Sequence, residues 1–322
     1  MSKVSILIPL FNSEKFIGDT IKSALLQTWQ HKEIIIVDDG STDSSLAIAR
    51  SFESETVKVY SQANHGAASA RNLAFKHSSG DYIQFLDADD LLSDDKIAKQ
   101  MQIAEVNNFD PGVLIFGKTA FFEVDCTETA ISGQPVNKSY DDPFNLLIDL
   151  FSFVSYISSH AYLINRELII RSGEWDENLS ANDDGEFFAR LISKSKKVLY
   201  CDEGISYYRR NISDSLSKQK SPKHTLSEYL SLKKTSETIL QHKNNDPGRA
   251  ACSHIFNWFI VEWYPGNKRL LSEVERTMKQ YGLTYFSGSP SRIYHFIKSI
   301  AGWRRALLFS DFYSGLKKKI IG

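Results

Sequence analysis

The sequence EIIIVDDGSTD, residues 33–43, is the stretch that decides the fold class expected for this chain. A short β-branched run followed at once by acids, glycine and serine is typical of a buried strand that ends in a turn. Similar strand patterns occur at 4–8, 57–60, 82–86 and 113–116. Apolar residues at helical spacing lie between them, at 16–25, 44–52, 67–77 and 94–107. Strands that alternate with helices predict an α/β fold, a mostly parallel, Rossmann-like sheet with helices on both faces.

The alternation weakens after residue 117, and the last hundred residues have a different pattern. We expect residues 118–220 to complete the sheet and to form the far side of a cleft. Residues 221–322 are predicted to be mainly helical. Three helices are expected there, at 226–241, 249–263 and 270–281. The domain prediction is therefore one α/β domain, 1–220, followed by a helical region, 221–322.

Composition excludes several classes of protein. The chain has 322 residues, 42% of them hydrophobic and 24% charged, which is typical of a globular protein and not of a disordered or collagenous one. Cys126, Cys201 and Cys252 are far apart and form no CxxC pair, which argues against a disulfide framework and a structural zinc site. No run approaches the ~18 apolar residues of a membrane span, and no signal peptide is recognisable. We expect a cytoplasmic protein.

The near-neutral net charge of −1 hides an uneven distribution. Residues 1–222 carry an excess of acids, whereas 223–322 carry an excess of Lys and Arg. In residues 291–322, basic side chains alternate with aromatic and aliphatic ones, a mixture suited to peripheral contact with an anionic membrane. A packed helix with a basic outer face and a self-association surface are the alternatives. Nucleic-acid binding is not expected, because the predicted cleft is acidic.

Acids gather where the predicted strands end. The second strand is followed by Asp38 and Asp39, and the fourth by Asp87, Asp89 and Asp90. Asp87 and Asp89 are two residues apart, so in an extended segment both side chains lie on one face. One could bind a hydroxyl such as that of a ribose while the other binds Mg²⁺ or Mn²⁺. A solvated turn rich in helix-capping Asp is the alternative.

Two further segments carry polar groups suited to a ligand site. In NHGAASARN, residues 64–72, Gly66 permits close approach of a ligand to the backbone, and Arg71 could bind a phosphate or form a salt bridge with a nearby acid. In NDDGEFFAR, residues 182–190, three acids occupy a predicted helix start. They could supply a general base, or merely interact favourably with the helix dipole.

Four motifs in this order resemble the signature of family 2 glycosyltransferases with the GT-A fold. They are residues 8–14, 37–43, 64–72 and 87–90, and the resemblance is close over 3–120 and weaker to about 217. It implies an inverting, Mn²⁺- or Mg²⁺-dependent transfer of a sugar from a nucleotide-diphosphate donor, usually a UDP-sugar. The implied acceptor is a saccharide or polyprenyl-linked hydroxyl in surface polysaccharide, lipopolysaccharide or capsule biosynthesis. Residues 1–117 would then bind the nucleotide-sugar, and 118–220 would form the acceptor half.

The resemblance also implies residue roles. Pro9 and Phe11 would line the base and ribose pocket, Asp39 would accept a hydrogen bond from uracil, and Asp87 would face the ribose. Asp89 would bind the metal ion. The full set of expected nucleotide-sugar contacts is Pro9, Phe11, Asn12, Glu14, Asp39, Asn64, Gly66, Arg71, Asp87 and Ala88.

The aligned position of the general base is Asp184, with Glu186 and Asp183 as the fallback candidates. The chain departs from the family pattern at Asn211, where relatives often have a histidine near the diphosphate, so Arg209 or Arg210 is a candidate to replace it.

His160 precedes the base motif, and a hydrogen-bonded structural role is favoured for it. Three other classes compete with the glycosyltransferase. A nucleotidyltransferase would be expected to have a Gly-rich basic loop where residues 9–12 read PLFN, and a receiver-like Mg²⁺-binding domain would leave the acids at 183–184 unexplained. A non-catalytic sugar-nucleotide-binding protein is disfavoured because the four motif acids are all present.

Overall fold

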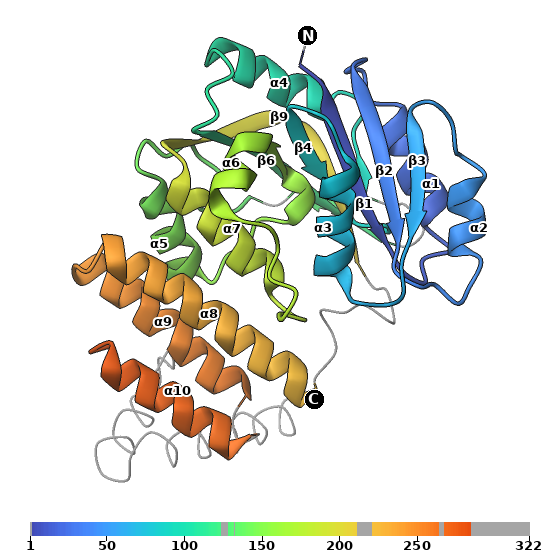
Figure 1. Cartoon of the computed structure of the whole chain (residues 1–322). Helices are drawn as coiled ribbons and strands as arrows, with labels where there is room; N and C mark the ends of the chain where they lie inside the picture. The colour runs from blue at the N-terminus through green and yellow to red at the C-terminus, as the bar shows by residue number, and fades with distance from the viewer. Residues whose placement is uncertain (1, 124–127, 132, 211–220, 264–266, 285–322) are drawn as a thin grey trace, which may run out of the picture. The chain divides into compact units, whose positions relative to one another are not determined.

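The computed structural model describes residues 2–123, 128–131, 133–210, 221–263 and 267–284. Within these residues one nine-stranded sheet runs in the order β3-β2-β1-β4-β8-β6-β9-β5, with β7 paired to β6 (Figure 1). The strands are β1 (Val4–Leu10), β2 (Lys32–Asp38), β3 (Val57–Ser61), β4 (Tyr82–Phe85), β5 (Leu91–Leu92), β6 (Val113–Phe122), β7 (Glu128–Ile131), β8 (Tyr162–Asn165) and β9 (Lys197–Arg209). The helices are α1 (Ile17–Leu25), α2 (Ser45–Arg50), α3 (Ala67–His77), α4 (Lys96–Val106), α5 (Pro143–Phe153), α6 (Arg166–Ser172), α7 (Asp183–Lys194), α8 (Pro222–His242), α9 (Asp246–Trp263) and α10 (Lys268–Gln280), with one 3₁₀ turn, η1 (Ser159–Ala161).

The predicted fold class is confirmed. Strands β3, β2, β1 and β4 are mutually parallel, as expected for βαβ units. The second half of the sheet is mixed, because β8 lies antiparallel between β4 and β6, whereas β6 and β9 are parallel. Each strand and helix predicted in the first 117 residues is present, with ends that differ by up to two residues, except that β6 extends six residues beyond the predicted 113–116.

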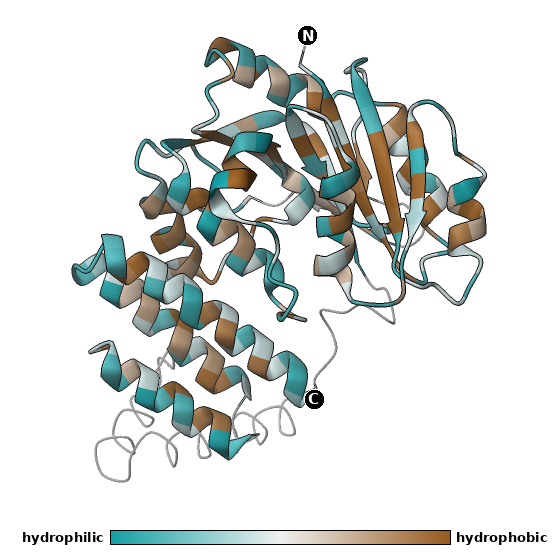
Figure 2. Ribbon diagram, in the orientation of Figure 1, coloured by the Kyte–Doolittle hydropathy of each residue, from teal (hydrophilic) through white to brown (hydrophobic). Residues whose placement is uncertain are grey.

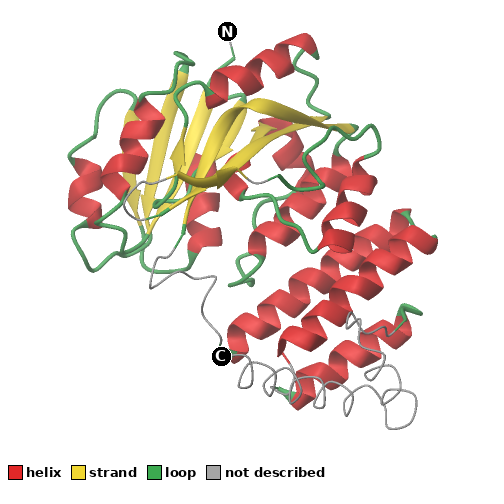
Figure 3. Cartoon of the chain, turned by 180° about the vertical axis from the view of Figure 1, so that it is seen from behind, coloured by secondary structure: helices red, strands yellow, loops and turns green. Residues whose placement is uncertain are grey.

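Helices cover both faces of the sheet. On one face, buried side chains of β1 and β2 pack against α1, α2 and α4; Ile6, Ile8, Ile21, Ile36 and Met101 belong to this core. Figures 1 and 3 show the sheet from opposite sides, with α3 and α7 on the other face. There, Phe85 of β4 packs edge-on against Trp175 and Phe187. Figure 2 shows that the middle of β2 is apolar. Because its side chains are apolar on both sides of the strand, β2 can be buried on both faces of the sheet.

The parallel strands end at the same edge of the sheet, and this edge positions the site. Leu10 of β1 is in register with Asp38 of β2, and β4 runs alongside β1 in the same direction. The loops that follow these strands therefore meet, as predicted from the strand pattern. In open α/β sheets this edge is where ligands bind.

The chain forms two compact units, residues 1–242 and 243–322. Helix α8 packs against α7 and α5 and belongs, with the sheet, to the first unit. The predicted division into an α/β domain, 1–220, and a helical region, 221–322, stays a prediction.

In the second unit, Arg249 donates to the carbonyl of Tyr281 and Asn257 donates to the carbonyl of Thr284, which joins α9 to the end of α10. The three predicted C-terminal helices are present as α8, α9 and α10. No helix within the described residues is long and apolar enough to cross a membrane. The predicted membrane-contact segment, 291–322, lies outside the described residues.

Candidate active site

The loops after β1 and β2 are joined by side chains from the predicted donor set. Asn12, in the left-handed backbone conformation with φ 46°, accepts a hydrogen bond from the Thr42 amide through Oδ1 at 2.8 Å. Glu14 accepts from the Ser44 amide at 2.9 Å. Asn12 and Glu14 therefore shape the loop. Phe11, the first residue after β1, is 46% exposed, whereas Pro9 is buried within β1.

Asp39 anchors the loop that precedes α3. Its side chain is buried, and Oδ1 accepts from Gln62 Nε2 at 2.7 Å and from the His65 amide at 2.9 Å, while Oδ2 accepts from the Gly66 amide at 2.8 Å. A carboxylate has about four acceptor positions, so three are used by the protein. Gly66 has φ 95° and open space where a Cβ would lie, and Asn64 is exposed beside it. The backbone at Gly66 is thus exposed, and its contact with a ligand stays a prediction.

Arg71 connects two acidic clusters that are far apart in the sequence. Its guanidinium donates to Asp87 Oδ1 at 2.8 Å and to Asp183 Oδ2 at 3.0 Å, and it lies 4.4 Å from the centre of the Trp175 ring. The Arg71 side chain is nearly buried, which lowers its pKa, but Asp87 and Asp183 outweigh burial and raise that pKa above its usual value. Burial raises the pKa of Asp87, but the guanidinium outweighs burial and holds that pKa below its usual value. Of the two roles considered for Arg71, the structure contains the salt bridge.

The acids after β4 differ sharply in their partners. Asp90 is buried, accepts from the Arg209 amide at 2.8 Å, and lies 3.0 Å from His160 Nδ1. Asp89 forms no ion pair within the described residues. Burial, together with the charges of Asp90 and Asp87, raises the pKa of Asp89 to about 8. This cluster has more negative charge than its neighbours neutralise.

His160 is completely buried, and its backbone carbonyl accepts from Gln84 and Ser206. Ligand atoms of Asp87, Asp90 and His160 lie within 4.8 Å of one another. The predicted structural role of His160 is consistent with this burial. Its place beside the DxD acids was not predicted, because Asp90 and His160 are 70 residues apart and no local pattern links them.

The two arginines at the end of β9 have different environments. Arg209 is buried between the rings of Phe16 and Phe122, at 4.6 and 4.4 Å, and its Nε donates to the carbonyl of Asp89 at 2.8 Å. Arg210 is exposed and lies over the ring of Phe121. Of the two candidates named for a phosphate contact, Arg210 is the accessible one. Asn211 lies outside the described residues.

The acids at the start of α7 are also distinguished by their partners. Asp183 pairs with Arg71, and Glu186 is buried in a two-point ion pair with Arg190 at 2.8 and 2.9 Å. Asp184 forms no ion pair within the described part of the chain. Burial and the charge of Asp183 raise the pKa of Asp184 to about 6. A carboxylate with a pKa near 6 is well suited to accept a proton at neutral pH.

Asn72 of α3 binds the segment between α6 and α7. Its side chain exchanges hydrogen bonds with the backbone of Trp175, accepting from the amide at 2.9 Å and donating to the carbonyl at 3.0 Å. Ala88, between the DxD acids, is buried and its carbonyl accepts from Thr20. The sequence pointed to the 64–72 motif but not to this docking role of Asn72.

Comparisons with known proteins agree with this geometry. Residues 5–133 match the model of glycosyl transferase family 2. The chain is 30% identical over 240 residues to an uncharacterized glycosyltransferase of Haemophilus influenzae, covering 73% of this chain and 90% of that protein. It is 31% identical over 227 residues to the putative teichuronic acid biosynthesis glycosyltransferase TuaG of Bacillus subtilis, covering 69% and 85%. This chain belongs to the family 2 glycosyltransferases.

Solved structures show the same fold. S. aureus TarS residues 1–349 in complex with UDP superimposes with a TM-score of 0.69 at 15% identity, covering 97% of this chain and 92% of that chain. Some curated relatives are much longer than the matched region. The chain spans only 20% of a Rickettsia conorii protein, an uncharacterized glycosyltransferase to which it is 41% identical over 124 residues.

Proposed function

We propose that this chain is an inverting, metal-dependent glycosyltransferase that moves a sugar from a UDP-sugar to a hydroxyl of a saccharide or lipid-linked acceptor. The observation that carries the proposal is the Arg71 bridge. It joins Asp87, on the expected donor side, to Asp183, next to the expected base on α7. The expected donor-binding edge and the expected proton acceptor are thereby held close to one another.

The donor proposal rests on the edge formed by the loops after β1, β2 and β4. The exposed ring of Phe11 is available to a nucleobase, and one acceptor position of Asp39 remains for the base. Asp87 keeps 30% of its side chain exposed beside Arg71, which suits contact with a ribose hydroxyl. TarS, which shares the fold, has been crystallised with UDP and with UDP-GlcNAc. These points favour a uridine nucleotide.

A divalent cation fits the acidic cluster after β4. Asp87 and Asp90 already accept from Arg71, Ser159 and the Arg209 amide, so they would have to exchange a donor for a metal ion. Asp89 forms no ion pair within the described residues, and burial together with the charges of Asp90 and Asp87 raises its pKa. We therefore assign the metal to Asp89. Mn²⁺ or Mg²⁺ bound there would stabilise the charge that develops on the leaving diphosphate.

Asp184 is the proposed general base. It would take the proton of the acceptor hydroxyl while the hydroxyl oxygen bonds to the anomeric carbon, and the bond to the diphosphate oxygen would break with its electron pair on the diphosphate. Glu186 is a weaker candidate because Arg190 binds both of its oxygens, and Asp183 because it pairs with Arg71. Asp184 alone of these three would enter the reaction without first breaking an ion pair within the described residues.

For the acceptor and the cellular location we propose only a class. The name of TuaG refers to teichuronic acid biosynthesis, which favours a role of this chain in surface polysaccharide synthesis. We propose the cytoplasmic side of the membrane as the place of the reaction. Residues 1–117 would bind the donor and 118–220 the acceptor. The proposed phosphate contact is Arg210, because it is exposed at the end of β9.

The test is calorimetric titration of the full chain with UDP, GDP, dTDP and CDP, each with and without Mn²⁺. The proposal predicts Mn²⁺-dependent binding of UDP. The anomeric configuration of the product, followed by NMR with the selected donor, then tests inversion. Binding without transfer to any acceptor or to water would instead support a non-catalytic sugar-nucleotide-binding protein.

A further inference from the structure

We infer that helix α8 is a positioning element of the active site, in which Ser227 and Ser231 set the direction of the proposed base, Asp184. The inference rests on the proposed function, because it concerns how that base is held. From sequence, α8 was assigned to a separate helical region. In the structure it packs along α7 within the first compact unit.

Ser227 binds the backbone of the loop that leads into α7. Its hydroxyl accepts from the amides of Ser180 at 2.8 Å and Ala181 at 3.0 Å, and it donates to the carbonyl of Ala181 at 2.8 Å. The side chain is 3% exposed. One buried hydroxyl thus satisfies three backbone groups that have no strand or helix partner of their own, and such groups are costly when left unpaired.

Ser231, one helical turn later, binds the next residue of the same loop. Its hydroxyl donates to the carbonyl of Asn182 at 2.6 Å and accepts from Asn182 Nδ2 at 3.0 Å, and the side chain is completely buried. Residues four apart lie on one face of a helix. Ser227 and Ser231 therefore present two hydroxyls in a row to residues 180–182.

This arrangement replaces the usual helix cap. Asn182 precedes α7 with φ 53° and makes no side-chain capping bond to the helix. Its side chain reaches Ser231 instead, and it fits because Gly185 has no Cβ; an added Cβ would lie 2.5 Å from Asn182 Oδ1. The first turn of α7, which carries Asp184, is thus oriented by hydroxyls from another helix.

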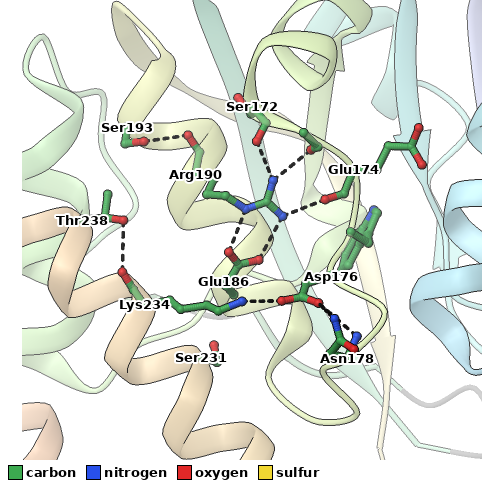
Figure 4. A network of polar contacts seen from close by, with 12 residues as sticks. Ser172, Glu174, Asp176, Asn178, Glu186, Arg190, Ser193, Ser231, Lys234 and Thr238 are labelled. Carbon is green, nitrogen blue, oxygen red and sulfur yellow. Dashed lines mark hydrogen bonds and ion pairs between the residues drawn. The ribbon is translucent and has the colours of Figure 1, made fainter.

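Two further ties fix the surrounding segment (Figure 4). Lys234 of α8 pairs with Asp176, and Arg190 of α7 donates to the carbonyls of Ser172, Gly173 and Glu174. Burial raises the pKa of Asp176, but Lys234 and Asn178 outweigh burial and lower it to about 2. The loop is therefore held from α8 on one side and from α7 on the other. The two serines differ from these ties because they bind the residues directly before Asp183 and Asp184.

The experiment compares Ser227→Ala, Ser231→Ala and the double variant with a matched control, Ser193→Ala. The Ser193 hydroxyl donates to the Arg190 carbonyl within α7 and does not touch the loop. We expect kcat to fall about 10- to 100-fold in the double variant, because a base misplaced by about 1 Å costs rate on that scale. UDP affinity and donor KM should be unchanged. Ser227→Thr, which keeps the hydroxyl, should have most of the kcat that Ser227→Ala loses.

Amide hydrogen exchange provides a readout that does not depend on activity. In Ser227→Ala the amides of Ser180 and Ala181 should exchange faster, whereas those of the β1 and β2 core should not. Unchanged exchange at these two amides, unchanged kcat in the double variant, or an equal loss of kcat in Ser193→Ala would each overturn the inference. If the wild type transfers no sugar although the two amides respond, the proposed function fails and the loop-holding contacts stand.

Discussion

Replacing Arg71 with Met should destabilise the first unit in a pH-dependent way. Met keeps an apolar stem of similar length but removes the charge that touches both Asp87 and Asp183. Breaking a buried ion pair from one side costs about 3–5 kcal/mol. Because the two carboxylate side chains remain 30% and 19% exposed, water lowers the cost, and we expect about 3 kcal/mol near neutral pH.

The pH dependence follows from the depressed pKa of Asp87. In the wild type, a carboxyl whose folded pKa is lowered contributes stability that is present above its unfolded pKa of about 3.9 and is lost as pH falls through the folded value. Without Arg71, burial is the largest remaining effect and should raise that pKa against the weaker lowering by His160 and Ser159. The variant then takes up a proton on folding as pH falls, so its deficit relative to wild type should shrink between about pH 7.5 and about pH 5.

The assay is urea unfolding of both proteins at the two pH values, followed by tryptophan fluorescence. Arg166→Met is the matched control, since Arg166 also lies over an aromatic ring, that of Phe75, but donates to the neutral groups of Gly80 and Ser78. Its deficit should be nearly the same at both pH values. An Arg71→Met deficit below about 1 kcal/mol, or one that does not change with pH, would refute the reasoning.

Three other substitutions separate the roles of the remaining site residues. Asp89→Ala should abolish the Mn²⁺ enhancement of UDP binding measured by calorimetry, and an unchanged enhancement would move the metal to the His160 cluster. Glu186→Gln should lower the free energy of unfolding by about 1–3 kcal/mol through the weakened Arg190 pair and leave transfer per folded molecule near wild type; a stable variant without transfer would make Glu186 the base. Gly185→Ala should destabilise the protein by about 1–3 kcal/mol, because the new methyl displaces Asn182, and a fully stable variant with wild-type kcat would contradict the described helix start.

Local patterns were sufficient to predict the parallel half of the sheet. The runs that became β1, β2 and β4 are rich in β-branched or aromatic residues and are buried along all or most of their length, so the same residues determine both the strand and its place in the core. The acids lie in the sequence at the strand ends or just after them. Their meeting at one edge required only that the strands be parallel.

Contacts between distant segments could not be predicted in the same way. Arg71 and Asp183 are 112 residues apart, and the sequence left open whether Arg71 binds a ligand or an acid. The hydroxyls of Ser227 and Ser231 have no pattern that indicates a partner, because serine in a helix is usually exposed or bonds to its own helix. Only the packing of α8 on α7 makes them part of the site. The order of Asp184 before Glu186, by contrast, is already expected from the family resemblance, and the local ion pair of Glu186 with Arg190, four residues later on α7, favours it.

The most direct test of the account is sugar transfer by Asp184→Asn beside wild type, with the donor that calorimetry selects and with nucleotide release as the readout. Wild-type kcat should rise with pH through about 6 and then level off, because the carboxylate must be ionised to accept the proton. The variant should bind UDP as tightly as wild type yet lose about 10²- to 10⁴-fold in kcat and lose that pH dependence. Near-wild-type transfer by Asp184→Asn, with the same pH profile, would contradict the assignment of the base.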